Sequence, residues 1–295
     1  MNILSLFDGI SCGMIALQRA NIKIDSYYAS EIDKDAIKIS NKNYPDIIRI
    51  GDVNVIDLEK LPKIDLIIGG SPCQSFSLVG KQLNFEDPRG KLFFKYVEIL
   101  NKLRELNPNI KFLLENVKMK KEYCDILSSH IGVQPHLINS SLFSAQNRQR
   151  YYWTNIQIPI FLPLRNITMK DIYLKNRDLR IIFNIKNTFD DFHSNNDESS
   201  CIQVGIANNI RGFDILKRVY SINGKSPTLT TCVGGNSQAK ISIGNNMYRK
   251  LLPIEYERLQ TIPEDYSQGS SNSARYKCLG NAWTVDVIAH IFKGL

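Results

Sequence analysis

The sequence predicts an α/β fold, with a doubly wound, mostly parallel sheet and a second, smaller and irregular domain. Short apolar runs alternate with helical patterns over residues 2–114, which is typical of strands joined by crossover helices. The alternation stops from about 160 to 245, and Gly, Asn and Ser become frequent between 205 and 246. With 295 residues, 43% of them hydrophobic, the chain can bury a large core.

Five apolar runs and three helical patterns make up the first part of the chain. The expected strands are 2–7, 24–30, 47–51, 65–69 and 111–114. The expected helices are 12–20, 33–43 and 92–106. Because parallel strands end at one edge of a sheet, we expect ligand-binding loops beyond their carboxyl ends. Helical signals return at 253–260 and 285–292, so the last segment is expected to pack back on the first domain.

Composition limits the classes of protein to which the chain can belong. Six cysteines are scattered without a C-x-x-C pair and there are four histidines, so we expect free thiols and no metal site. No apolar run is long enough for a membrane helix and the first residues do not resemble a signal peptide, so we expect a soluble, intracellular protein. A net charge of +8 with a pI of about 9.1 is a weak indication of a polyanionic partner.

A glycine-containing turn follows the first predicted strand, and acidic residues follow the next two. The turn Phe7-Asp8-Gly9-Ile10-Ser11-Cys12-Gly13 would let the backbone approach a ligand, although a glycine pair alone is more often an ordinary tight turn. Glu31 lies about 20 residues further on, where a carboxylate suits a pair of ribose hydroxyls. Asp52 could accept a hydrogen bond from an adenine amino group, but each acid could equally be a helix cap.

Three further segments carry reactive or charged side chains. In 69–77, Pro72 stiffens the chain and presents Cys73 at a strand end in polar surroundings, which argues against a buried structural thiol. Glu115 is expected to follow the strand at 111–114, where it is a candidate functional acid or an ordinary capping residue. Arg148 and Arg150 would share one face of an extended chain, as a clamp for phosphate and base or as a solvated basic loop.

Together these segments resemble the motif series of the DNA (cytosine-5)-methyltransferases. The series in chain order is FDGIS-x-G, EID, GDV, GGSPCQS, ENV, QNRQR and GNAW. Single motifs are weak, but seven in the right order with similar spacing are specific. The resemblance implies a Rossmann-like, S-adenosylmethionine-dependent methyltransferase fold. It divides the chain into a catalytic and cofactor-binding domain (1–159), a target-recognition domain (160–245) and a segment completing the catalytic domain (246–295).

The resemblance also implies roles for individual residues. Cys73 matches the nucleophile and Glu115 the acid that faces the cytosine ring, while Arg148 and Arg150 match the basic pair near the target base. Trp283 stands where many members carry a smaller residue. The implied cofactor-binding residues are Phe7, Asp8, Gly9, Gly13, Glu31, Ile32, Asp52, Val53, Asn281 and Trp283.

The implied reaction moves a methyl group from S-adenosylmethionine to carbon 5 of a flipped-out cytosine in duplex DNA, with S-adenosylhomocysteine as product and no metal. A monomer acting in the cytoplasm is expected, and a cognate restriction endonuclease would act separately. Residues 74–91 resemble the loop that closes over DNA. The stretch 160–245 carries eleven basic and seven acidic residues, a balance of +4. Its candidate base-reading side chains are Arg165, Arg177, Arg180, Asn208, Asn209 and Arg211.

Three other interpretations fit the sequence less well. The tRNA-methylating branch of the same fold shows a Cys-Phe-Thr signature that this chain lacks. A catalytically silent regulator would usually have lost the nucleophile or the glycine turn, and both are present. A nicotinamide dehydrogenase explains the glycine turn and Glu31 but gives Pro72-Cys73 and Gln146–Arg150 no role.

Overall fold

The computed structural model describes residues 1–71, 88–160, 165–174, 183–184, 200–207, 209–234, 236–244 and 246–295, with side chains left out at 88–90 and 183–184. Cys73 and most of the segment 74–91 lie outside the described residues, as do Arg177, Arg180 and Asn208. The chain divides into two compact units. Unit 1 comprises 1–138, 149–160 and 285–295, and unit 2 comprises 139–148 and 161–284.

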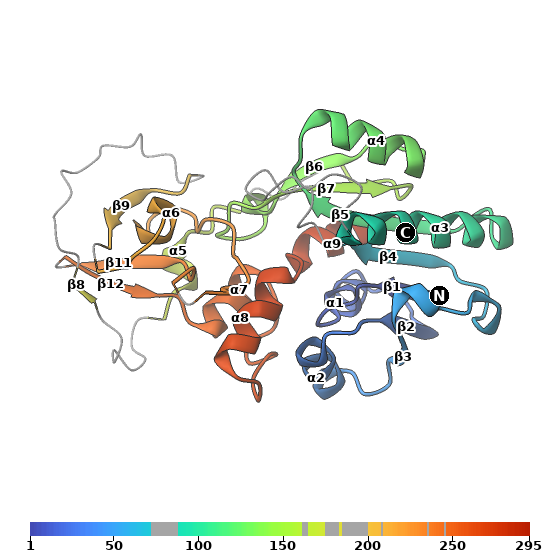
Figure 1. The fold of residues 1–295 in the computed structure, drawn as a ribbon, viewed down its shortest axis with the longest axis horizontal. Helices are drawn as coiled ribbons and strands as arrows, with labels where there is room; N and C mark the ends of the chain where they lie inside the picture. Colours follow the sequence, from blue (N-terminus) through green and yellow to red (C-terminus); the bar gives the residue numbers. More distant parts are fainter. Residues whose placement is uncertain are drawn as a thin grey trace. The chain divides into compact units, whose positions relative to one another are not determined.

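Unit 1 contains a sheet that has seven strands in the described part of the chain (Figure 1). From edge to edge they are β3 (Ile48–Gly51), β2 (Ser26–Ser30), β1 (Asn2–Leu6), β4 (Leu66–Gly70), β5 (Lys111–Val117), β7 (Gln149–Thr154) and β6 (His136–Asn139). The first five pair in parallel, and β7 is antiparallel to β5. The sheet is therefore mostly parallel, and its strand order reverses between β1 and β4, as predicted for a doubly wound fold.

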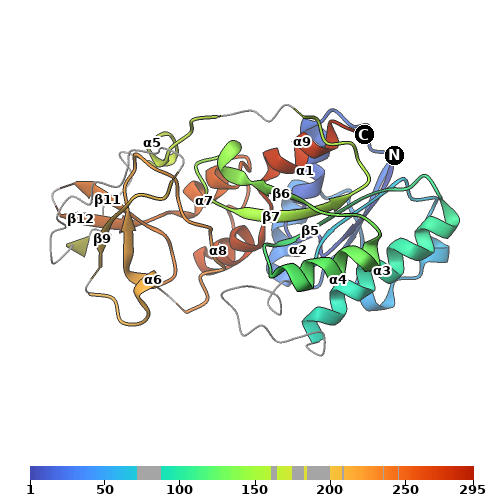
Figure 2. The ribbon, with the colours of Figure 1, turned by 90° about the horizontal axis from the view of Figure 1, so that it is seen from above.

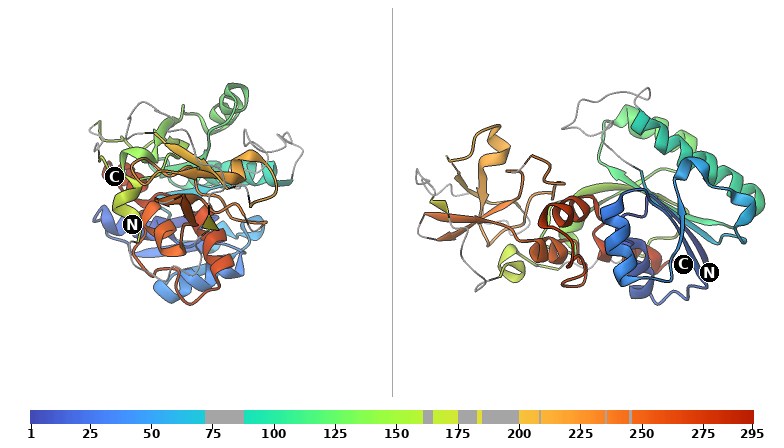
Figure 3. Two further views of the ribbon diagram at one scale, coloured as in Figure 1. Left: turned by 90° about the vertical axis from the view of Figure 1, so that its left-hand side faces the viewer. Right: turned by 60° about the horizontal axis from the view of Figure 1, so that its bottom comes forward.

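Helices cover both faces of this sheet (Figures 2 and 3). On one face α1 (Cys12–Arg19) packs against α9 (Val285–Phe292), with α2 (Lys34–Asn43) beside the edge strands. On the other face α3 (Pro88–Leu106) and α4 (Lys121–Ile131) contribute to a core with alternate residues of β1, β4 and β5. Successive strand residues point to opposite faces, so the strands buried on both faces are continuously apolar.

Unit 2 contains a smaller sheet that the sequence pattern did not predict. Among the described residues its order is β8 (Phe183–Asn184), β12 (Met247–Lys250), β11 (Lys240–Gly244), β10 (Arg218–Tyr220) and β9 (Gln203–Ile206). The helices of this unit are α5 (Met169–Ile172), α6 (Asp214–Lys217), α7 (Pro253–Leu259) and α8 (Asn272–Asn281). Short 3-10 turns lie at 53–55 and 58–60 in unit 1 and at 140–142 in unit 2. The functional domain boundaries inferred from the motifs stay a prediction.

No helix in the described ranges is long and apolar enough to cross a membrane.

Candidate active site

The parallel sheet brings the described site residues that follow its strands to one edge. The glycine turn follows β1, Glu31 follows β2 and Asp52 follows β3. Gly70 ends β4, and Glu115 is its register partner on β5. All of these strands run in the same direction, so their carboxyl ends open on a common side, where doubly wound folds bind ligands.

The turn after β1 has an unusual backbone. Phe7, Gly9 and Ser11 have φ angles of 56°, 59° and 61°, so three alternate residues are left-handed. This conformation costs a non-glycine residue about 1–2 kcal/mol, whereas glycine adopts it freely. Nothing lies within 4 Å of the position that a Cβ on Gly9 would take. The turn therefore offers open space beside its backbone at Gly9.

Glu31 ties this turn to the end of β2. Its Oε2 accepts a hydrogen bond from the Gly9 amide at 2.7 Å, and its Oε1 accepts from the Ile32 and Asp33 amides at 2.8 Å each. A carboxylate has about four acceptor positions, so one remains for a ligand hydroxyl. The Ile32 side chain is apolar and 69% exposed. A polar acceptor beside an open glycine and an exposed apolar side chain is an arrangement that could hold a nucleoside.

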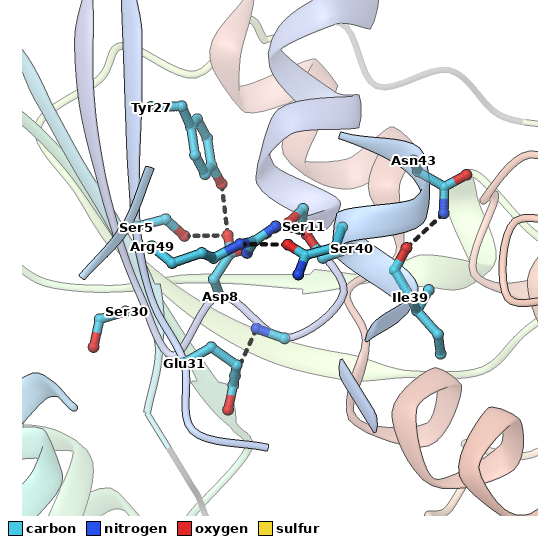
Figure 4. A network of polar contacts seen from close by, with 12 residues as sticks. Ser5, Asp8, Ser11, Tyr27, Ser30, Glu31, Ile39, Ser40, Asn43 and Arg49 are labelled. Atoms are coloured by element: carbon cyan, nitrogen blue, oxygen red, sulfur yellow. Dashed lines mark hydrogen bonds and ion pairs between the residues drawn. The ribbon is translucent and has the colours of Figure 1, made fainter. Parts of the chain in front are cut away.

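The side chain of Asp8 and the missing side chain of Gly13, two residues expected in contact with the cofactor, have structural roles. The Asp8 side chain is fully buried and bonded to Ser5, Ser11 and Tyr27 (Figure 4). A Cβ on Gly13 would lie 2.4 Å from Ile68 Cδ1 and 2.8 Å from Tyr27 Oη, so glycine lets α1 approach the sheet closely. Their backbone, rather than their side chains, is what they can offer to a ligand.

Asp52 and Val53 lie in the 3-10 turn after β3. Asp52 caps this turn, since its Oδ1 accepts from the Asn54 amide nitrogen and from Asn54 Nδ2, both at 2.9 Å. Val53 is 4% exposed and belongs to the core. The capping interpretation of Asp52, which the sequence left open, is thus part of the structure.

Glu115 lies inside β5, two residues before its end, and not after the strand as expected. The strand is longer because β7 pairs with it through Val117. Across that pair Arg150 Nε lies 3.0 Å from Glu115 Oε1, with side chains 12% and 11% exposed. The next residue, Asn116, donates from Nδ2 to Ser71 Oγ at 3.0 Å. A fixed carboxylate–guanidinium pair therefore borders the point where β4 leads into Pro72-Cys73.

Arg148 and Arg150 do not form the expected pair on one extended chain. Arg148 precedes β7, and its guanidinium bonds to other partners than that of Arg150. It donates to the carbonyl oxygens of Gly280 and Ala282 at 3.5 and 3.1 Å and is 4% exposed. Unit 2 thus uses Arg148 to hold the segment around Asn281. Asn281 is exposed at the end of α8, and Trp283 is partly buried.

Sequence reasoning missed several polar residues that shape these segments. Tyr27 and Arg49 bond to Asp8 within unit 1, and Gln146 and Gln260 bond to each other within unit 2. Tyr27 and Arg49 lie in strands, and Gln146 and Gln260 lie outside the helices and strands. The available signal in each case was only a polar side chain close to an apolar run. Such a residue needs buried partners, and that need predicts a network without predicting its members.

Comparison with known proteins gives the same result as the motif series. The family model described as C-5 cytosine-specific DNA methylase matches residues 1–295. The chain is 39% identical over 170 residues to "Orphan methyltransferase M.SPRI" of Bacillus phage SPR, which covers 53% of this chain and 38% of that protein. It is 28% identical to "Type II methyltransferase M.HhaI" of Haemophilus parahaemolyticus over 99% of this chain and 93% of that protein. The match thus spans well under half of the phage relative.

A solved methyltransferase of Entamoeba histolytica, EhMeth, has a similar fold, with a TM-score of 0.75 and 16% identity over 100% of this chain and 97% of that one. The fold, the order of the motifs and the match over the full length agree. The chain therefore belongs to the C-5 cytosine-specific DNA methylase family.

Proposed function

We propose that this protein transfers a methyl group from S-adenosylmethionine to carbon 5 of a flipped-out cytosine in a specific duplex DNA sequence. The observation that carries the proposal is the Glu115–Arg150 pair at the sheet edge that also holds the glycine turn and Glu31. Family membership supports the reaction class, and the edge supplies both an acid for the base and a place for a nucleoside.

Cys73 is the nucleophile of this proposal. Its thiolate forms a bond to carbon 6, which moves an electron pair to carbon 5 and makes that carbon nucleophilic. When bound, S-adenosylmethionine supplies an electrophilic methyl group and leaves as S-adenosylhomocysteine. Removal of the carbon 5 proton by water then expels the thiolate. No step needs a metal ion.

Glu115 acts on the other side of the ring. By sharing a proton with ring nitrogen 3 it offsets the negative charge that thiolate addition would leave on the base. Arg150 orients this carboxylate, since a charge-assisted bond at 3.0 Å holds one of its oxygens. A stacked cytosine cannot reach such a site, so the target base has to leave the helix.

Methyl incorporation into duplex DNA tests the proposal. We expect the protein expressed in a methylation-free bacterial host to leave 5-methylcytosine at one sequence, mapped by bisulfite sequencing. Cys73→Ser should abolish transfer while keeping cofactor binding, since a hydroxyl is far less acidic than a thiol with a pKa of about 8.5. Methylation of tRNA in place of duplex DNA, or normal turnover of Cys73→Ser, would overturn the assignment.

The partners follow from the same proposal. The protein would act on DNA as a monomer, in the cytoplasm, and any cognate restriction endonuclease would be a separate protein. Relatives named as orphan and as type II methyltransferases both occur among its matches. Host DNA that resists a nuclease encoded beside this gene only when this protein is expressed would identify a restriction–modification pair.

A further inference from the structure

A buried polar cluster lies directly beneath the glycine turn of unit 1 (Figure 4). Asp8 is at its centre. Its Oδ1 accepts hydrogen bonds from Ser5 Oγ and Tyr27 Oη, both at 2.7 Å, and its Oδ2 accepts from Ser11 Oγ at 2.5 Å. Arg49 lies 3.5 Å from Oδ2. Both oxygen atoms of the carboxylate thus accept hydrogen bonds, from residues at both ends of the turn and from two neighbouring strands.

The sheet register explains why these groups meet. Ser5, Ala29 and Arg49 are aligned across β1, β2 and β3, so their side chains point to the same face. Tyr27 is two residues before Ala29 and shares that face. Ala29, between the two polar neighbours, has only a methyl group and is fully buried.

Arg49 connects the cluster to α2. It donates from Nη2 to Ser40 Oγ at 2.5 Å and from Nε to Asn41 Oδ1 at 3.0 Å, and Ser40 Oγ also contacts Ser11 Oγ. Ser11 is the N-cap residue of α1, yet its side chain makes no capping bond to the helix backbone. Its hydroxyl serves the cluster instead, although a serine in that position ordinarily caps its own helix.

A buried polar cluster of this kind contributes little net stability to a fold. Burial raises the pKa of Asp8 above its usual value, and its hydrogen bonds and Arg49 only partly offset that effect. An ionised carboxylate in such a place is costly, and apolar residues of similar shape would often serve stability as well or better. What the carboxylate does secure is geometry, because it joins Ser5, before the turn, to Ser11, after it. Between them lie Phe7, whose backbone is left-handed, and Gly9, whose amide donates a hydrogen bond to Glu31.

We infer that Asp8, Tyr27 and Arg49 are positioning residues, which hold the turn 7–11 in the conformation that receives the nucleoside end of the cofactor. The inference rests on the proposed function. Ligand affinity falls in proportion to the fraction of molecules that have a competent site. A turn with two left-handed non-glycine residues would often leave that conformation if no buried side chain held it there. Loss of the cluster should therefore weaken cofactor binding more than it destabilises the fold.

Titration calorimetry with S-adenosylhomocysteine, beside thermal melting, tests the inference. Asp8→Asn keeps the shape of the side chain and removes its charge, while Tyr27→Phe keeps the aromatic ring and removes the hydroxyl that donates to Asp8. We expect each to weaken binding by roughly 5- to 30-fold, the effect of losing one or two good hydrogen bonds. The melting temperature of Asp8→Asn should fall only slightly, because Ser11 and Arg49 keep Ser40 as a partner. Tyr28→Phe, the same change on the next residue of β2, is the matched control and should bind normally.

The outcomes separate this inference from the function on which it rests. If the wild-type protein does not bind S-adenosylhomocysteine, the proposed function fails. If the wild type binds and Glu31→Ala binds weakly, but Asp8→Asn and Tyr27→Phe bind like the wild type, only the positioning role is wrong. The positioning role is also wrong if the variants regain wild-type affinity when the assay is cooled far below their melting temperatures. Their weaker binding would then reflect partial unfolding. The double variant should lose less affinity than the two single losses combined, since both act through one cluster.

Discussion

At the scale of single residues, Glu31 combines two tasks that are usually separate. Three of its acceptor positions hold backbone amides of its own loop and of the glycine turn, and we propose that the fourth accepts from a ribose hydroxyl of the cofactor. We expect Glu31→Ala to weaken S-adenosylmethionine binding by about 1–3 kcal/mol, because ribose hydroxyls and the Gly9 amide both lose an acceptor. Calorimetry measures it, with the exposed helix residue Glu105→Ala as control. Unchanged affinity would move the cofactor site elsewhere.

The Glu115–Arg150 pair allows stability and activity to be separated. Arg150→Met leaves a largely buried carboxylate without its cation and should cost about 3 kcal/mol of unfolding free energy, with a strong loss of methyl transfer. The double variant Glu115→Gln/Arg150→Met removes both charges. We expect it to regain most of the stability, measured by urea denaturation, and none of the activity. A double variant that is as unstable as Arg150→Met would mean that the pair is not coupled.

At the scale of elements, the end of α8 is held by a buried side-chain amide. Gln260 donates from Nε2 to the carbonyl oxygens of Leu279 and Ala282 at 2.9 and 3.0 Å. Its Oε1 accepts from Gln146 Nε2 at 3.1 Å and from Thr284 Oγ1 at 2.9 Å. Arg148 adds two bonds to the same segment. Gln260 thus joins two side chains and two backbone carbonyl groups.

Gln260→Ala should therefore be unusually harmful for a single amide. It leaves buried donors and acceptors without partners, at about 1–3 kcal/mol for each group, and we expect a loss of at least about 2 kcal/mol after relaxation. Thermal or urea unfolding measures the loss. Gln268→Ala, an exposed glutamine of the same unit, is the control and should change stability by less than about 0.5 kcal/mol. Equal effects of the two changes would contradict the bracing role of Gln260.

At the scale of the whole molecule, we propose that residues 160–245 choose the DNA sequence. Within this stretch the described candidates Arg165, Asn209 and Arg211 are exposed, and Asn209 Oδ1 accepts a bond from Tyr248. Alanine at a base contact should relax one position of the target at a cost of about 1–3 kcal/mol. A phosphate contact should weaken all sequences alike and reduce the salt dependence. Bisulfite sequencing of single alanine variants distinguishes them, and an unchanged target in every variant would contradict this location.

The sequence by itself was sufficient wherever local pattern decides structure. The alternation of apolar runs and helical patterns predicted β1, α1 and α2 to within one or two residues, and α9 at 285–292. Periodicity predicts these elements because each helix buries one continuous face and β1 is mostly apolar along its length. The motif order likewise identified the family, since it records which residues stand at the ends of the parallel strands.

Tertiary structure decided what depends on partners far away in the chain. β5 extends past Glu115 because β7, more than thirty residues later, supplies its hydrogen bonds. Asp8 turns inward because Tyr27 and Arg49 lie beneath it, and Arg148 turns to Gly280. The second sheet formed where the pattern indicated only irregular chain. A buried polar side chain takes its position from whichever groups can satisfy it, and long-range packing alone determines which groups those are.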